Sequence, residues 1–160
     1  MASHAPSAAR NLLGKSAEEL RAFVQEFGEP GYRGAQIYHA LYAEGRRDFA
    51  AMTNLPATLR ERLAREAAIA LPRIARRHVS SDGAVRYVLA PDGPTDGKPT
   101  TIETVFMPEE NRQTICISTQ AGCAVDCHFC LTATLGLVRN LTPGEIIGQV
   151  LVALDDNRTA

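Results

Sequence analysis

All four cysteines of the 160-residue chain lie in one segment, Cys116-Ile-Ser-Thr-Gln-Ala-Gly-Cys123-Ala-Val-Asp-Cys127-His-Phe-Cys130. The last three follow the spacing Cys-x3-Cys-x2-Cys, which lets three thiolates on one loop converge on a single metal centre. Thiolates select zinc or iron-sulfur clusters over ions that prefer oxygen. A structural zinc site takes four protein ligands, whereas a cluster held by three cysteines keeps one iron open. The segment therefore predicts a metal centre and favours a cluster with an open iron.

The composition is that of a globular chain without a membrane segment. Apolar residues make up 45% of the sequence, enough to bury a core. No run of eighteen apolar residues or signal peptide is present, so we expect a cytoplasmic protein with no membrane partner. In that compartment a cysteine cluster indicates a metal or redox site more than a disulfide framework.

Charge is distributed unevenly along the chain. Residues 1–80 hold 12 Lys and Arg against 8 Asp and Glu, a net of +4, and residues 81–160 hold 5 against 10, a net of −5. A basic amino-terminal half can meet RNA phosphates, although such a surplus is also typical of an ordinary solvated surface.

Helical periodicity dominates residues 12–70, after a small polar stretch over residues 1–11 that we expect to be a disordered tail. Ser16 and Glu19 form a capping box before a helix that ends near Gly28. Further helices are predicted over residues 33–43 and from Pro56 to about Ala67.

Alternating apolar residues predict strands from Arg73 onward. Two runs flank an Asp-Gly turn at residues 81–83 and predict a hairpin. Residues 91–99 read as a loop, and residues 101–107 and 112–118 as further strands. Arg73, Arg76 and Arg77 either contact phosphate or protect an edge strand. A second capping box, Thr142 to Glu145, opens a helix, and Arg139 and Asn140 before it either orient the cysteine loop or are solvated.

The cysteine loop, with Phe129 just before its last cysteine, resembles that of the radical S-adenosylmethionine (SAM) enzymes. Its flanks, Ile102-Glu103-Thr-Val-Phe-Met-Pro108 and Gly136-Leu-Val-Arg139-Asn140-Leu141-Thr142, resemble the RlmN family, which methylates carbon 2 of an adenosine in 23S rRNA. The stretches Gly28-Glu-Pro-Gly-Tyr32-Arg33 and Met52-Thr53-Asn54-Leu55-Pro56 resemble the family's helical RNA-binding domain.

The resemblance implies a role for each site residue. Cys123, Cys127 and Cys130 would hold a 4Fe-4S cluster whose open iron binds SAM, which is cleaved to a 5′-deoxyadenosyl radical. Phe129 would lie beside the SAM adenine, Glu103 would accept a proton, and Cys116 would form a disulfide with a methyl-carrying cysteine that this chain lacks. Without the resemblance, Glu103 is ordinarily solvent-facing, and Cys116 is a small buried residue or a fourth zinc ligand.

The resulting expectation is an α/β fold, α+β in this fragment, divided into four segments. Residues 1–11 form the tail, 12–70 a helical RNA-binding accessory domain, 71–108 a β extension, and 109–160 the start of a radical SAM barrel. The chain would be an incomplete, inactive piece of a monomeric enzyme that needs an electron donor and acts on 23S rRNA and also tRNA. A related carbon-8 methyltransferase and a non-enzymatic zinc-binding RNA module remain open alternatives.

Overall fold

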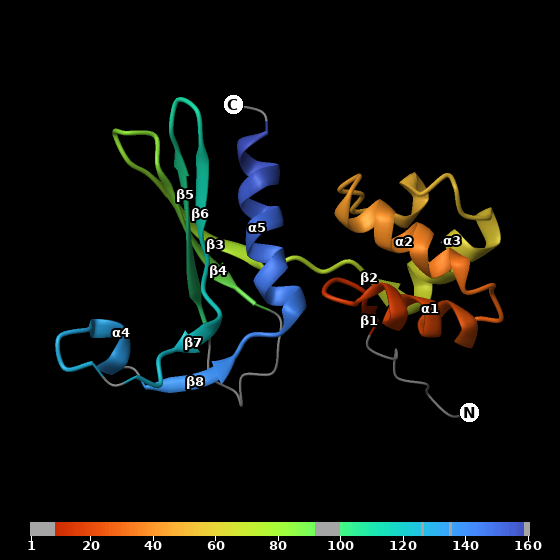
Figure 1. Ribbon diagram of the computed structural model, residues 1–160, viewed down its shortest axis with the longest axis horizontal. Helices are drawn as coiled ribbons and strands as arrows, with labels where there is room; N and C mark the ends of the chain where they lie inside the picture. The colour runs from red at the N-terminus through yellow and green to blue at the C-terminus, as the bar shows by residue number, and fades with distance from the viewer. Residues whose placement is uncertain (1–8, 92–99, 126, 135, 159–160) are drawn as a thin grey trace, which may run out of the picture. The chain divides into compact units, whose positions relative to one another are not determined.

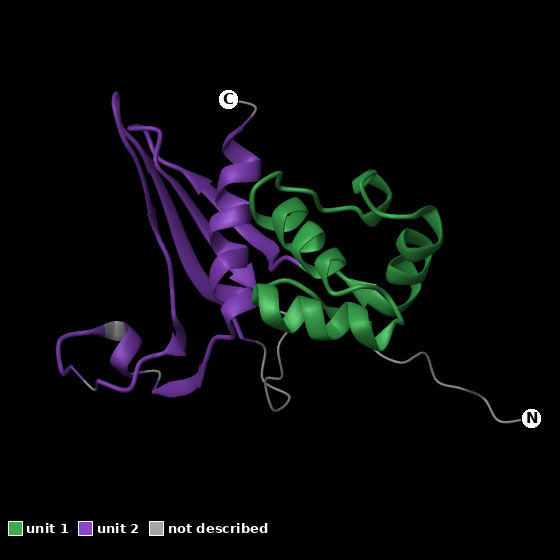
Figure 2. Cartoon of the chain, turned by 45° about the vertical axis from the view of Figure 1, so that its right-hand side comes forward, with its two compact units in different colours: residues 1–70 green, residues 71–160 purple. Residues whose placement is uncertain are grey.

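The computed structural model describes residues 9–91, 100–125, 127–134 and 136–158. Its chain divides into two compact units, Met1–Ala70 and Leu71–Ala160 (Figure 2). Helices and antiparallel strands are both present, so the fold is mixed α and β (Figure 1). Within the described residues, no helix combines the length and the apolar character needed to cross a membrane.

Over its described residues, 9–70, unit 1 is built from three short helices and one 3-10 turn: α1 (Ala17–Glu26), α2 (Tyr32–Tyr42), η1 (Phe49–Ala51) and α3 (Ala57–Glu66). The predicted capping box is confirmed, because Ser16 Oγ accepts from the Glu19 backbone N–H and Glu19 Oε2 accepts from that of Ser16. Apolar side chains from every helix meet in one core, which includes Leu20, Ile37 and Leu63.

One feature of unit 1 differs from the sequence prediction. Strand β1 (Arg10–Asn11) pairs in parallel with β2 (Ala67–Ala68), so the disordered tail predicted for residues 1–11 is wrong at Arg10 and Asn11, and residues 1–8 lie outside the described residues. The pairing brings the first and last described elements of the unit together, and the Asn11 side chain reinforces it through bonds with the backbone of Ala70.

Unit 2 contains a four-stranded antiparallel sheet in the order β3-β4-β5-β6: Arg73–Val79, Val85–Ala90, Ile102–Pro108 and Gln113–Cys116. The hairpin prediction is confirmed, with Gly83 at φ +84° in its turn. Helix α5 (Pro143–Asn157) runs along the sheet (Figure 1), and Val152 and Ala153 pack with Val85, Tyr87 and Leu89 in one core. Of the predicted 91–99 loop, residues 92–99 lie outside the described part of the chain.

A second, smaller sheet frames the cysteine loop. Strand β7 (Gln120–Gly122) pairs antiparallel with β8 (Leu137–Asn140), and the short helix α4 (Leu131–Thr134) lies between them in the chain. The three cysteines of the predicted metal site therefore lie on one loop, which follows β7 and returns as β8 just before α5.

Candidate functional site

The two ends of the cysteine loop are joined by backbone hydrogen bonds. The Cys123 N–H donates to the Gly136 carbonyl at 3.1 Å, and the Leu141 N–H donates to the Thr119 carbonyl at 3.0 Å. Gly122 has a φ of +78°, and a Cβ there would lie 1.9 Å from the Gly136 oxygen. Only glycine permits so close an approach, so Gly122 fixes how tightly the loop closes at its base.

Arg139 and Glu145 form a bidentate ion pair that ties β8 to the first turn of α5. The guanidinium donates to the two carboxylate oxygens at 2.7 and 2.8 Å, and the side chains are only 16% and 10% exposed. Burial raises the pKa of Glu145, but hydrogen bonds from Arg139 and Thr142 outweigh it and lower that pKa to about 2. Glu145 is thus ionised whenever the protein is folded near neutral pH.

Asn140 also contributes to the closure of the loop. Its Oδ1 accepts a hydrogen bond from Gln120 Nε2 at 2.8 Å, across the β7–β8 pair. The structure thus gives both residues that precede α5 contacts at the base of the loop, which favours their orienting role over simple solvation.

The three cysteines of the loop are free and half-buried. Cys123 Sγ accepts from the Val125 N–H at 3.4 Å. Hydrogen bonds from the Ala133 and Thr132 backbone lower the pKa of Cys130, and burial opposes them. Across the described residues, no three His, Cys, Asp or Glu side chains gather closely enough to hold a metal ion. The three thiols therefore lie on one loop, but they are not gathered around a common point in this structure.

Phe129, which the resemblance places beside a cofactor, is 94% exposed. Val125, on the same loop, is 73% exposed. Two large apolar side chains exposed so fully on one short segment are typical of a surface that is covered when a ligand or another part of the protein binds.

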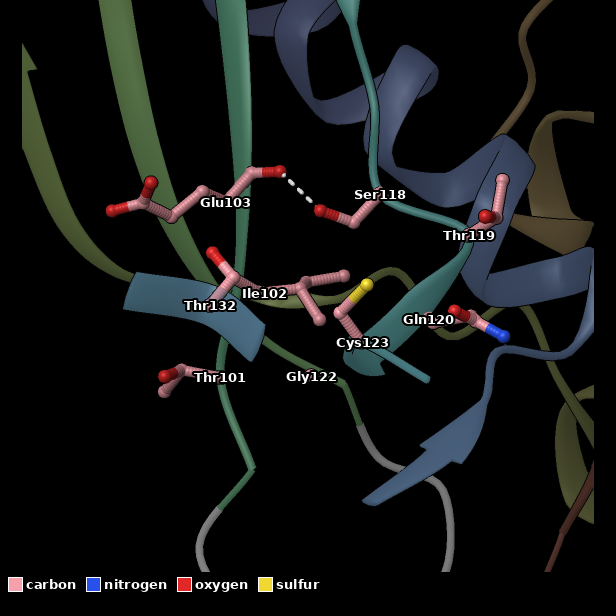
Figure 3. Close-up of a pocket in the computed structure, with 9 residues that line it drawn as sticks. All are labelled: Thr101, Ile102, Glu103, Ser118, Thr119, Gln120, Gly122, Cys123 and Thr132. Atoms are coloured by element: carbon pink, nitrogen blue, oxygen red, sulfur yellow. Dashed lines mark hydrogen bonds between the residues drawn. The ribbon is translucent and has the colours of Figure 1, made fainter. Parts of the chain in front are cut away.

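A pocket of about 530 Å³ lies beside the loop and contains two of the predicted site residues (Figure 3). Glu103 on β5 and Cys123 at the start of the loop both line it, and the lining also includes Ser118, Gln120 and Thr132. The Ser118 hydroxyl donates to the Glu103 carbonyl at 2.8 Å, which fixes the backbone on the strand side of the pocket.

The sheet register puts Glu103 and Cys116 on one face. Val88 pairs with Glu103, and Val105 pairs with Cys116. Directly paired residues share a face of a sheet, as do residues two apart on one strand. Glu103 and Cys116 are therefore diagonal neighbours on the face opposite α5.

Cys116 is exposed, so the interpretation of this cysteine as a small buried residue is wrong. The buried residues of β4 and β5 point toward α5. Cys116 pairs with Val105, which alternates with those buried residues, so Cys116 lies on the other face of the sheet. Glu103 is also exposed, as an alternating strand position predicts.

The same register defines an open face, which comprises Arg76, His78, Arg86, Val88, Glu103, Val105 and Cys116. All seven are exposed or half-buried, and Arg86 lies 3.8 Å from the Glu103 carboxylate. Arg77 is on the α5 face instead, where its Nε donates to Asp156 at 2.8 Å. The open face thus joins a cationic edge to the two predicted catalytic residues.

Comparison with known proteins identifies the family. Residues 10–69 match the model described as the ribosomal RNA large subunit methyltransferase N-terminal domain. A dual-specificity RNA methyltransferase RlmN from Paracoccus denitrificans is 47% identical over 154 residues, 94% of this chain, and one from Rhodospirillum rubrum is 42% identical over 146 residues, 91% of it. The chain belongs to the RlmN family.

The chain spans 38% and 33% of the lengths of those two RlmN relatives. A solved radical SAM methyltransferase from Sphaerobacter thermophilus superposes with a TM-score of 0.80 at 37% identity, over 94% of this chain and 43% of that protein. The mixed helical and antiparallel arrangement of this RlmN-family chain is therefore found within a larger enzyme.

The donor set of this RlmN-family chain fits an iron-sulfur cluster in its chemistry. Three free thiols lie on one loop, and backbone N–H groups bond to the sulfurs of Cys123 and Cys130. Such bonds favour the thiolate, which is the form that binds metal.

Several residues of the site were not predicted from the RlmN-like motifs. The pocket-lining Ser118 and Thr132 are small polar residues without a spacing signal, and the pairing of Arg139 with Glu145 depends on strand β8, which was not predicted either. Gln149 could have been singled out from the sequence, because it is a polar amide within the apolar stretch of α5.

Proposed function

We propose that the chain is the amino-terminal part of a radical SAM methyltransferase that methylates carbon 2 of an adenosine in 23S rRNA and also acts on tRNA. The observation that carries this proposal is the three-cysteine loop of an RlmN-family chain, beside a pocket that Glu103 also lines. The relatives are named dual-specificity RNA methyltransferases, which favours two kinds of RNA substrate.

Cys123, Cys127 and Cys130 would hold a 4Fe-4S cluster, and Phe129 would cover the SAM adenine. When bound, the cluster and SAM supply the one-electron chemistry that activates a methyl group. The exposure of Phe129 supports this assignment, because an aromatic ring that is 94% exposed is available to a cofactor.

Glu103 and Cys116 would act on the RNA base from the open face. Glu103 would accept a proton from the base, as a carboxylate within reach of it can. Cys116 would use its exposed thiol to form a disulfide with the methyl-carrying cysteine of the longer protein, which frees the methylated base. Their diagonal placement on one face lets both groups reach the same bound nucleotide.

The cationic edge of the open face would contact RNA phosphates. Arg76, His78 and Arg86 are exposed there and lead toward Glu103. Arg77 is paired with Asp156 and contributes less. A base must be unstacked to enter such a site, so a structured RNA with a splayed adenosine suits it. Helical unit 1 would act as an RNA-binding accessory domain.

Strand β6 and helix α5 would be the first βα unit of the barrel. Their order along the chain and the cysteine loop between them support this arrangement, because active sites of parallel barrels follow the carboxyl ends of strands. In the longer protein, the next strand would add in parallel to the free edge of β6.

Anaerobic reconstitution of the chain with iron and sulfide tests the metal assignment. We expect uptake of iron and acid-labile sulfide that is lost in each of Cys123→Ala, Cys127→Ala and Cys130→Ala. Cys116→Ala is the matched control and should keep its iron, because Cys116 is on the sheet and not on the loop.

Two outcomes would overturn this assignment. When zinc is supplied together with iron, uptake of zinc in place of iron, lost also in Cys116→Ala, would establish the zinc-binding RNA module instead. Iron uptake that survives all three loop substitutions would remove these cysteines as ligands.

The role of Cys116 is tested in the longer protein that contains this chain. Cys116→Ala there should accumulate a covalent protein–RNA adduct. Mass spectrometry of rRNA nucleosides from cells that express the unsubstituted longer protein should identify the methylated carbon. Normal turnover by that variant would refute the proposed disulfide step, and methylation at carbon 8 would refute the proposed position.

A further inference from the structure

Gln149 is a fully buried amide whose hydrogen-bonding capacity is completely used. Its Oε1 accepts from Thr104 Oγ1 and from the Ser118 N–H, each at 2.8 Å. Its Nε2 donates to the Ser118 carbonyl at 2.7 Å and to the Glu145 carbonyl at 3.2 Å. A side-chain amide has two acceptor sites and two donor hydrogens, so all four are satisfied. A buried network in which every member is bonded holds its partners in one arrangement.

The partners of Gln149 lie at the places from which the predicted site residues extend. Ser118 is two residues after Cys116 and begins the connection to the cysteine loop. Thr104 directly follows Glu103 on β5. Ser118 is also bonded to the Glu103 carbonyl (Figure 3), so three backbone segments meet around this one amide.

Gln149 also belongs to the part of α5 that holds the far end of the loop. Glu145, one turn earlier on the helix, binds Arg139 on the returning strand. The outgoing end of the loop is held through Ser118 and the returning end through Arg139. Between these two ends, Val125 and Phe129 project into solvent, so the loop's position depends on its ends.

We propose that Gln149 is a positioning residue, which fixes where the cysteine loop leaves the sheet relative to Glu103 and Cys116. That the loop holds a cluster rests on the proposed function, whereas the positioning itself does not. The side chains of similar length do not make the same four bonds, because an ionised glutamate cannot donate to the two carbonyls and methionine can neither donate nor accept as an amide does.

Hydrogen exchange in the metal-free chain tests the positioning directly. In Gln149→Met, which keeps the length of the side chain, the Ser118 amide loses its acceptor. Its exchange rate should rise at least about tenfold relative to that of the Val152 amide in the same helix, which corresponds to about 1.4 kcal/mol of local protection.

Two control variants separate positioning from a general loss of stability. Asp156→Ala removes the carboxylate that bonds to Tyr87 and Arg77 near the other end of α5. It should destabilise the unit without raising Ser118 exchange relative to Val152. Thr104→Val removes one bond of the amide but leaves both bonds to Ser118, so Ser118 should stay protected.

Iron uptake provides a second measurement. Gln149→Met should take up less iron and sulfide than the unsubstituted chain, while Asp156→Ala should match it. No uptake by the unsubstituted chain would count against the proposed function alone, since the exchange comparison needs no metal. Ser118 exchange that is unchanged in Gln149→Met would overturn the positioning role.

The test holds even if Gln149→Met does not fold. The proposal requires the Ser118 amide of the unsubstituted chain to exchange as slowly as the amides of α5. Exchange at the rate of a solvent-exposed amide would refute it without any variant.

Discussion

Replacing Glu145 with Gln should strongly destabilise unit 2. The Glu145 carboxylate binds the Arg139 guanidinium through two hydrogen bonds of 2.7 and 2.8 Å, and it accepts a third from the Thr142 N–H at 2.8 Å. Glutamine keeps the size of the side chain but removes the charge and presents an N–H₂ group to the guanidinium. The largely buried Arg139 would then lack a counter-charge at this position.

The size of the effect follows from the pKa of Glu145. That pKa is lowered from 4.5 to about 2 in the folded chain. A difference of about 2.5 units corresponds to about 3 kcal/mol of the free energy of unfolding. Because the folded-state pKa is the lower one, this stability is fully present above about pH 4.5. It is lost as the pH falls from there toward about 2.

Urea unfolding, followed through the NMR amide signals of Gly144 and Gly148 in α5, measures the effect within unit 2. At about pH 7 the substitution should reduce the free energy of unfolding by about 3 kcal/mol. The difference between the two proteins should narrow as the pH is lowered to about 3, because the native carboxylate then begins to lose its advantage. Asp156, whose pKa is also lowered, is present in both proteins and cancels in the comparison.

Glu109→Gln is the matched control. Glu109 also forms an ion pair with an arginine, Arg112, at 2.8 Å, but the side chains are 53% and 70% exposed. Exposed pairs contribute less than about 1 kcal/mol, so this variant should unfold nearly as the parent does. If Glu145→Gln unfolds like Glu109→Gln, or if its loss of unfolding free energy is the same at every pH, the stability attributed to the buried ion pair is wrong.

Three glycine substitutions should separate close packing from backbone strain. Gly34→Ala should lower the unfolding midpoint of unit 1 in urea by an amount equivalent to about 1–3 kcal/mol, because its Cβ would lie 2.5 Å from the Arg21 backbone nitrogen; an unchanged midpoint would contradict the close approach of α1 and α2. Gly122→Ala should abolish the exchange protection of the Cys123 amide, because the new Cβ clashes with the Gly136 carbonyl. Gly28 is also at positive φ but has open space around it, so Gly28→Ala should reduce the free energy of unfolding by only about 1 kcal/mol. If the Cys123 amide of Gly122→Ala loses only about 1 kcal/mol of protection, the same as the cost at Gly28, then strain alone explains the effect.

The helices were predictable because their signals are local. The capping boxes at Ser16 and Thr142 each lie within four consecutive residues, and both are formed in the structure. The Asp-Gly turn of the hairpin is equally local, and it forms with Gly83 in the left-handed region. In each case the residues that interact are also neighbours in the sequence, so the sequence pattern is enough to predict the local structure.

The short strand pairs could not be predicted for the opposite reason. The residues of β1 and β2 are separated by more than fifty positions, and each strand has only two residues. Such a strand is too short to show alternation, and its pairing is decided by tertiary packing. The pair β7 and β8 has the same difficulty, with three and four residues on either side of the cysteine loop.

The spacing of the cysteines predicts which residues share a loop but not what fixes that loop in space. Glu145 illustrates the difference. As the third helical residue after Thr142 it completes a capping box, and that role is readable from the sequence. Its second role, binding Arg139, depends on β8 returning along the helix, which no local pattern specifies.

Gln149 extends the same argument to the site itself. An isolated polar residue in an apolar helix face is usually a sign of exposure, yet here it is buried because three backbone segments supply its partners. Removing any one segment would leave a buried amide unsatisfied, so the burial of Gln149 is evidence that strand β5, the start of the loop and helix α5 are assembled together. Its replacement therefore tests the geometry of the whole site more directly than any cysteine substitution, which would report only on the metal.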